Sequence, residues 1–252
     1  MKSILLCCVF MLFTISALAA TPKNVTYKSG SDTVHGILYT PAGKGPFPGI
    51  IVIHEWWGLN GWVKEQASKL ADQGYITLAI DLYRGKVATT PNEAHEFMGG
   101  VPQDRAKRDL QAAFNFLQSH ADVKKDRIGA IGWCMGGGYA LQLAIDQPSL
   151  RADAINYGVY DYASLAKNPD QIKKINASIL GLFGGQDRGI PTNDLKAFVD
   201  AMAKQGKKAD FSVYSDAGHA FENPNNKDGY RPKDAQSAWK RIVVFFSDTL
   251  KK

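Results

Sequence analysis

Gly132-Trp133-Cys134-Met135-Gly136 is the stretch of this sequence that decides the fold. The apolar residues 128–131 before it predict a short buried strand, and residues 136–144 after it predict the start of a helix. A nucleophilic side chain between glycines at a strand-to-helix turn indicates a sharp, strained bend that exposes the nucleophile. The small neighbours let other parts of the chain pass close to the bend. Here the nucleophile would be the thiol of Cys134.

The rest of the chain alternates predicted strands with predicted helices. We expect an N-terminal hairpin over 26–39 with its turn at 30–32, and a loop or broken helix over 161–176. Apolar runs predict strands over 49–53, 76–80, 154–159, 179–183 and 211–214, and apolar periodicity predicts helices over 63–73, 102–120, a segment capped by Thr192, and 234–250. This alternation predicts an α/β protein whose mostly parallel sheet has helices on both faces. Ligands then bind beyond the carboxyl ends of the strands.

The N-terminus has the pattern of a secretory signal peptide. Lys2 precedes an apolar stretch over 4–15 and a small-x-small site over 17–19, which predicts cleavage after Ala19. The apolar stretch is short for a membrane span, and no later segment approaches the required length. We therefore expect a periplasmic or secreted protein without a membrane span in its mature chain.

Cleavage would also change the cysteine content. Cys7 and Cys8 would leave with the signal peptide, so Cys134 alone would remain of the three cysteines. A single thiol in a compartment where disulfides normally form favours a reactive cysteine. The alternative is a buried, inert cysteine that packs as a small hydrophobic residue.

The composition indicates one globular domain, which we place over residues 20–252. The chain has 252 residues, of which 45% are hydrophobic and 21% charged, enough for one sizeable core. Its formal net charge of +6 is spread along the sequence without a basic cluster, which argues against a nucleic-acid partner. We expect a monomer that acts on a small molecule.

A nucleophilic thiol needs a base, and the base needs an orienting group. The only histidine after Cys134 is His219, which follows the last predicted strand, so we expect it to be the base. Asp187 follows the strand predicted over 179–183 and is our candidate for the acid, in the chain order nucleophile, acid, histidine. Asp194 and Asp216 are the alternatives, although the first suits a helix start and the second a turn.

The oxyanion of the reaction needs two backbone N–H donors. We expect them from Met135, directly after the nucleophile, and from Trp56, in the loop after the strand predicted over 49–53. Glu55 in the same loop would lie near the thiol, where it would disfavour the thiolate or accept a hydrogen bond from the thiol. Trp56, Trp57 and Trp62 either line a pocket or belong to the core.

The sequence carries no motif for a metal ion or an organic cofactor. The His-Glu pairs at 54–55 and 95–96 lack the second histidine of a zinc motif. The glycines over 136–138 lack the spacing of a dinucleotide fingerprint, and no phosphate-binding loop motif occurs. We therefore expect neither a metal nor a cofactor.

Together these segments resemble the dienelactone hydrolase family of α/β-hydrolases. The resemblance covers nearly the whole mature chain and depends on His54-Glu55-Trp56-Trp57-Gly58, Asp81-Leu82-Tyr83, residues 132–137 and Ala217-Gly218-His219-Ala220-Phe221. It implies an α/β-hydrolase fold and a Cys134–His219–Asp187 triad. It also implies that Glu55 holds the resting thiol, and that an acyl-thioester forms as a cyclic enol-lactone opens, without metal or cofactor.

The chain departs from the family where a substrate carboxylate would bind. Two arginines hold that carboxylate in well-known members. Arg84, after Tyr83, is shifted by one residue from the first, and Asn223 stands at the second. We expect Arg84 and Tyr83 to contact substrate, and a broader esterase or lactonase role. Acyl transfer and a non-hydrolytic binding protein on the same fold are the alternatives.

Overall fold

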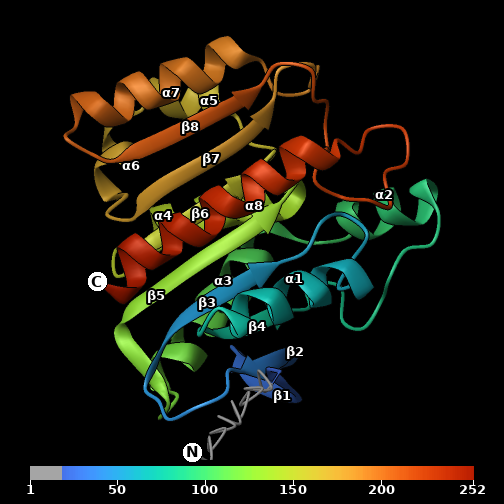
Figure 1. Ribbon diagram of the computed structural model, residues 1–252, viewed down its shortest axis with the longest axis vertical. Helices are drawn as coiled ribbons and strands as arrows, with labels where there is room; N and C mark the ends of the chain where they lie inside the picture. The colour runs from blue at the N-terminus through green and yellow to red at the C-terminus, as the bar shows by residue number, and fades with distance from the viewer. Residues whose placement is uncertain (1–18) are drawn as a thin grey trace, which may run out of the picture.

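The computed structural model describes residues 19–252 as one eight-stranded sheet flanked by helices (Figure 1). The predicted signal peptide falls almost entirely on residues 1–18, which lie outside the described residues. The strands are β1 (Thr21–Ser29), β2 (Asp32–Thr40), β3 (Phe47–Ile53), β4 (Ile76–Ile80), β5 (Val123–Trp133), β6 (Ala152–Asn156), β7 (Ser178–Gly184) and β8 (Ala209–Tyr214).

The sheet is mostly parallel. Its strand order is β1-β2-β4-β3-β5-β6-β7-β8; β1 and β2 form an antiparallel hairpin, β2 pairs antiparallel with β4, and the remaining pairs are parallel. The central strands β3 and β5 are buried on both faces, and residues 50–53 of β3 are completely inaccessible to solvent. Continuous apolar runs are typical of such strands, and this confirms the predicted fold class.

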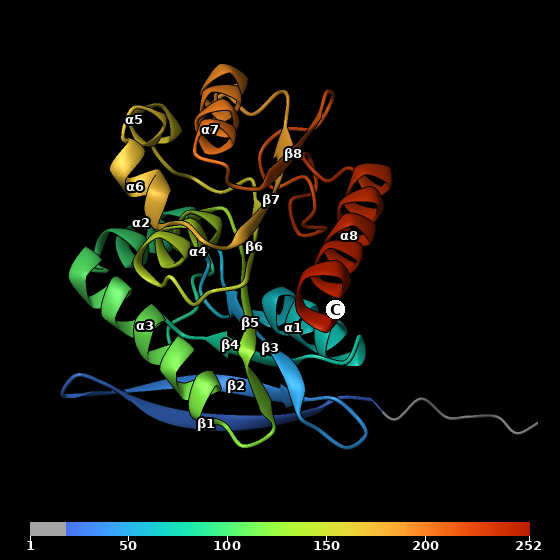
Figure 2. The same ribbon diagram turned by 90° about the vertical axis from the view of Figure 1, so that its left-hand side faces the viewer.

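Helices cover both faces of this sheet (Figure 2). The helices are α1 (Gly61–Asp72), α2 (Pro91–Gly99), α3 (Gln103–Ser119), α4 (Met135–Asp146), α5 (Tyr162–Ala166), α6 (Pro169–Lys174), α7 (Thr192–Lys204) and α8 (Pro232–Phe246), with a π-helical turn at Ser247–Lys251. Figure 2 shows α1 and α8 on one face and the others on the opposite face. Among residues 19–252, every helix is too short or too polar to cross a membrane.

Three local details differ from the sequence-based expectations. Thr192 is the first residue of α7 rather than its cap, and Pro191 occupies the cap position. Strand β6 ends at Asn156, not at residue 159, because the chain turns at Tyr157 with a φ of 36°. Helix α2 was not expected, since only one of its residues, Ala94, is buried and its apolar periodicity is weak.

Candidate active site

Cys134 lies at the bend between β5 and α4, where the carboxyl end of a central strand meets the start of a helix. Its φ of 55° and ψ of −120° are strained for a residue with a side chain. The backbone around the bend is pinned: the Cys134 N–H donates to the carbonyl of Asn156 at 3.0 Å, and its carbonyl accepts from the N–H of Val159 at 3.0 Å. The thiol is half-buried, so substrate can reach it.

The glycines after Cys134 are required by close backbone contacts. A Cβ atom on Gly136 would collide with the carbonyls of Ile53 and His54 at the end of β3. A Cβ atom on Gly137 would lie 2.6 Å from the Cα of Gly158. The start of α4 can therefore sit against β3 and the loop after β6 only because these positions lack side chains.

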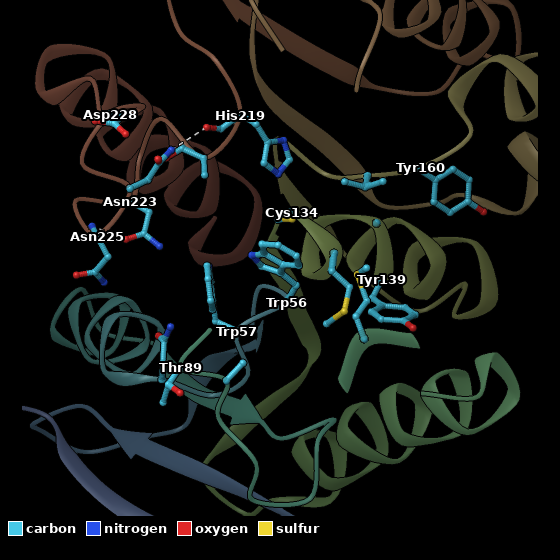
Figure 3. A pocket seen from close by; sticks show the side chains of 18 of the residues that line it. Trp56, Trp57, Thr89, Cys134, Tyr139, Tyr160, His219, Asn223, Asn225 and Asp228 are labelled. Atoms are coloured by element: carbon cyan, nitrogen blue, oxygen red, sulfur yellow. Dashed lines mark hydrogen bonds between the residues drawn. The ribbon is translucent and has the colours of Figure 1, made fainter. Parts of the chain in front are cut away.

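His219 and Asp187 meet at the same edge of the sheet, on the loops that follow β8 and β7. Nδ1 of His219 hydrogen-bonds Oδ2 of Asp187 at 2.6 Å, and the Asp187 side chain is almost completely buried. Figure 3 shows the ring directed towards Cys134. Burial lowers the pKa of His219, but the hydrogen bond to Asp187 and the proximity of Cys134 outweigh it and raise this pKa to about 10.

The loop that carries His219 is held in place by Asn226. Its Nδ2 donates to the carbonyl of His219 at 3.1 Å and to that of Ala220 at 3.3 Å. Ala220 has a φ of 56°, so it joins Cys134 and Tyr157 as residues of the site with a positive φ although they carry side chains. The ring of Tyr157 packs edge-on against His219 with centroids 5.2 Å apart. These contacts orient the imidazole before substrate binds.

Glu55 is buried behind the reacting groups. Its Oε1 accepts a hydrogen bond from the hydroxyl of Tyr157 at 3.1 Å, and its Oε2 accepts one from Nδ2 of Asn223 at 2.7 Å. Burial raises the pKa of Glu55 to about 7, although Asn223, Tyr157 and the charge of His219 lower it. The resemblance implied that Glu55 holds the resting thiol; in this arrangement both carboxylate oxygens of Glu55 are bound to Tyr157 and Asn223, and that role stays a prediction.

The two expected oxyanion donors lie on either side of Cys134. Met135 is the first residue of α4, so its N–H has no partner within the helix. Trp56 lies in the loop after β3, and its carbonyl accepts a hydrogen bond from the Tyr83 hydroxyl at 3.1 Å. His54 braces the same loop, because Nδ1 lies 2.6 Å from the carbonyl of Glu55 and Nε2 accepts from the N–H of Leu82.

Two residues expected to contact substrate do not line the cavity. The guanidinium of Arg84 pairs with the buried carboxylate of Asp109 at 2.7 Å, beside the turn of the β1–β2 hairpin. Tyr83 is buried, and its hydroxyl contacts the Trp56 carbonyl and the sulfur of Met135 at 3.3 Å. Neither side chain is among those that line the cavity, so the expected contacts with substrate are not found in this arrangement.

A cavity of about 1100 Å³ opens above Cys134 and His219. Trp56 and Trp57 line it, as one of the two expectations for the tryptophans had it. Trp62 follows the other expectation, because it belongs to the core and packs against Trp133. The remaining wall is made of residues from the loops after β3 and β4, from α2, α3 and α4, and from the loops after β6 and β8. They include Asn60, Thr89, Met98, Gln103, Tyr139, Gln142, Tyr160, Asn223, Asn225 and Asn226.

Three contacts that shape the site escaped the sequence analysis. Tyr157 and Asn223 bind Glu55, and Glu222 accepts a hydrogen bond from Nε1 of Trp133 at 3.2 Å. The only sequence signal was proximity: Glu222 and Asn223 follow His219 within four residues, and Tyr157 lies in the strand predicted over 154–159. Within residues 19–252 no group of three or more His, Cys, Asp or Glu side chains is arranged to hold a metal ion.

Known proteins resemble this chain over most of its length. A sequence model of the dienelactone hydrolase family matches residues 34–250. The chain is 37% identical over 215 residues to a Methylorubrum extorquens protein named "Putative carboxymethylenebutenolidase", covering 82% of this chain and 74% of that protein. It is 33% identical over 216 residues to a Bradyrhizobium protein named "Probable 2-oxo-3-(5-oxofuran-2-ylidene)propanoate lactonase", covering 82% and 86%.

Solved structures agree with this similarity. The crystal structure described as a "Putative Dienelactone Hydrolase" from Klebsiella pneumoniae matches with a TM-score of 0.80 at 25% identity, covering 91% of this chain and 99% of that one. Acylaminoacyl peptidase of Pyrococcus horikoshii matches with a TM-score of 0.75 at 17% identity, covering 94% of this chain and 43% of that one, which shows a shared fold.

Proposed function

The chain belongs to the dienelactone hydrolase family, and from that premise we propose that it hydrolyses carboxylic esters or lactones with Cys134 as its nucleophile. The observation that carries the proposal is the His219 imidazole, which is bonded to Asp187 and directed towards Cys134 where both Cys134 and His219 line a cavity. A thiol, a base and an orienting carboxylate in this order perform acyl transfer on unrelated folds.

In the first half-reaction, His219 takes the thiol proton and the sulfur of Cys134 attacks the substrate carbonyl carbon. The carbonyl electron pair moves onto oxygen, where the N–H groups of Met135 and Trp56 stabilise the charge. The bond to the alcohol oxygen then breaks, and His219 returns its proton to that oxygen. An acyl-thioester on Cys134 remains; for a lactone, the released hydroxyl stays attached to the acyl group.

In the second half-reaction, His219 removes a proton from water, and the resulting hydroxide attacks the thioester carbonyl. The carbon–sulfur bond breaks, the carboxylic acid leaves and Cys134 regains its proton. Asp187 keeps the imidazole in the productive orientation throughout. Glu55 touches neither reacting atom here and acts through its charge, which favours the imidazolium form of His219.

Alkylation of Cys134 tests this mechanism. Iodoacetamide labelling, followed by mass spectrometry of the labelled peptide, is compared with the residual hydrolysis of an aryl ester. We expect activity to fall in proportion to labelling. Added substrate should slow both the labelling of Cys134 and the loss of activity. Full labelling with unchanged turnover would refute the role of Cys134. Product analysis with added alcohols separates hydrolysis from acyl transfer, because a transferase would form new esters.

The predicted export of the protein is part of the same proposal but depends on the sequence alone. Residues 1–19 would be removed on secretion, and the mature monomer would act in the periplasm or outside the cell. The N-terminal sequence of the protein recovered from a cell fraction tests this expectation.

A further inference from the structure

The cavity above Cys134 has few positive charges in its walls. Apart from His219, which is paired with Asp187, its charged lining residues are Lys227 and Asp228, which are neighbours in sequence, opposite in charge and exposed. Because Lys227 is exposed, a carboxylate bound to it stays in contact with water. Deeper in the cavity, beside Cys134, the described residues provide no lysine or arginine.

No arginine lines the cavity, because nearby arginines are used elsewhere. Arg84 pairs with Asp109, and Nη2 of Arg105 donates to the carbonyl of Leu82 at 3.2 Å. Arginine is the side chain best suited to bind a carboxylate, since its fork of N–H groups matches the two oxygens. Among the described residues, the guanidinium groups of these arginines therefore lie behind the cavity wall and do not line the cavity.

Uncharged amide and aromatic side chains replace the missing cations. Six lining residues carry a side-chain amide: Asn60, Gln103, Gln142, Asn223, Asn225 and Asn226. Figure 3 shows Asn223 and Asn225 on one side of Cys134 and Tyr139 and Tyr160 on the other. Amides and tyrosines hydrogen-bond uncharged oxygen groups, and aromatic rings pack on apolar ones.

Two acidic side chains, Glu55 and Asp187, are buried behind the wall. Both ends of the Asn223 amide are already engaged, because Nδ2 donates to Glu55 and Oδ1 accepts from the N–H of Asn225 at 2.9 Å. A carboxylate that leaves water for the inner part of this cavity loses its hydration and meets no lysine or arginine among the described lining residues, which disfavours its binding.

We propose that this site selects esters or lactones that carry no carboxylate near the scissile bond. The inference rests on the proposed function and adds the charge class of its substrate: an uncharged acyl group joined to an uncharged alcohol. Such a molecule can place its apolar parts against the tryptophans and tyrosines and its neutral oxygens against the amides.

A matched pair of esters tests the inference. Mono-4-nitrophenyl adipate carries a free carboxylate, and methyl 4-nitrophenyl adipate has the same leaving group with that carboxylate masked. We expect kcat/KM at neutral pH to be at least about tenfold higher for the methyl ester, with the difference in KM. Equal values, or a preference for the free acid, would overturn the inference.

Asn225 offers a place to restore the missing charge. Its side chain is exposed at the cavity and makes no hydrogen bond to the described residues. Asn225→Arg should raise kcat/KM for the free acid relative to the methyl ester by about tenfold, and salt should weaken the gain. Asn225→Gln is the uncharged control and should leave the ratio unchanged. An unchanged ratio in Asn225→Arg would refute the charge explanation.

Binding to a variant without the thiol separates this inference from the proposed function. Calorimetry with Cys134→Ala and the two intact esters measures the charge preference without turnover. If the wild type hydrolyses neither ester but the variant binds the methyl ester more tightly, the proposed function fails and the inference holds. If hydrolysis depends on Cys134 but the variant binds the free acid at least as tightly, the inference alone fails.

Discussion

At the scale of single residues, Asp187 decides which nitrogen of His219 faces the nucleophile. Its bond to Nδ1 leaves Nε2 for Cys134. Asp187→Asn would still occupy the same space but would favour the wrong tautomer of the imidazole. We expect ester hydrolysis to fall by a factor of about 10³ or more, with little change in the unfolding temperature. Steady-state kinetics and thermal unfolding measure both quantities.

Asp194 provides the matched control for this substitution. It was an alternative acid in the sequence, but it lies in the first turn of α7 and makes no contact with His219. Asp194→Asn should retain nearly full activity and lose at most about 1 kcal/mol of stability, because it only removes a favourable charge at a helix start. Equal losses of activity in the two variants would contradict the assignment of Asp187.

Glu222 gives the protein a pH-dependent stability. The carboxyl group is buried, although the residue as a whole is partly exposed, and burial raises its pKa to about 8, with the charge of Glu55 adding to the effect. The unfolded chain therefore loses this proton above pH 4.5, whereas the folded protein keeps it until about pH 8. Stability must fall as the pH rises through this window, because the unfolded state binds fewer protons.

Glu222→Gln should remove this dependence. The amide oxygen can still accept the hydrogen bond from Trp133, so the fold keeps that contact. We expect the variant to match the wild type near pH 4 and to exceed its unfolding free energy by a few kcal/mol, an order-of-magnitude figure, near pH 8. Urea unfolding at the two pH values measures the difference. The same advantage at both pH values would mean that packing, not titration, is the cause.

At the scale of elements, the start of α4 is held against its neighbours by glycine. Gly137→Ala would place a Cβ atom 2.6 Å from the Cα of Gly158 and 3.1 Å from the carbonyl of Asn156. The second contact matters because the same carbonyl accepts the N–H of Cys134. We expect a loss of about 2–3 kcal/mol of stability together with a loss of activity, as measured by urea unfolding and ester kinetics.

Gly99→Ala is the matched control for that variant. Gly99 ends α2, and a Cβ atom there would meet no atom within 4 Å. The substitution should be neutral or stabilise the protein by up to about 1 kcal/mol, because alanine favours the helix more than glycine does. A comparable loss in Gly99→Ala would show that the α4 effect is not caused by the close approach.

At the scale of the whole molecule, charged contacts join the N-terminal hairpin to α3. Arg84 pairs with Asp109 of α3, which also accepts a hydrogen bond from Ser29 of β1 at 2.5 Å, and Arg108 of α3 pairs with Asp32 of β2 at 2.7 Å. The residues proposed to be catalytic lie at the carboxyl ends of the parallel strands, whereas this network holds the antiparallel edge of the sheet against α3.

Arg84→Met separates these two roles. The methionine keeps much of the apolar stem but leaves Asp109 without its cation, so we expect a loss of about 1–3 kcal/mol of stability. Because Arg84 does not line the cavity, kcat/KM for an uncharged ester should stay within about threefold of the wild type, equivalent to under 1 kcal/mol. A large rise in KM with unchanged stability would contradict this prediction and show that Arg84 contributes to substrate binding.

Much of the fold was predictable because its signals are local. Buried parallel strands are continuous apolar runs, so β3, β4 and β7 were found within two residues of their ends. Helix α2 was missed because it packs few apolar residues, and its capping box at Thr90 and Glu93 was the remaining signal. Strand β6 ends at the turn made by Tyr157, and α7 begins after Pro191. The periodicity of apolar residues does not indicate either boundary.

The sequence by itself determined the family and the α/β-hydrolase fold, and it put Cys134, His219 and Asp187 at the carboxyl ends of strands. These follow from glycines at one bend and from the order of residues at strand ends, which parallel topology brings to one edge. Only the tertiary structure decided what Glu55 binds and what Arg84 does. Asn223 reaches Glu55 across 168 residues of sequence, and Arg84 turns to Asp109 rather than to the cavity. Side-chain direction and pairing depend on packing between distant segments, which no local pattern records.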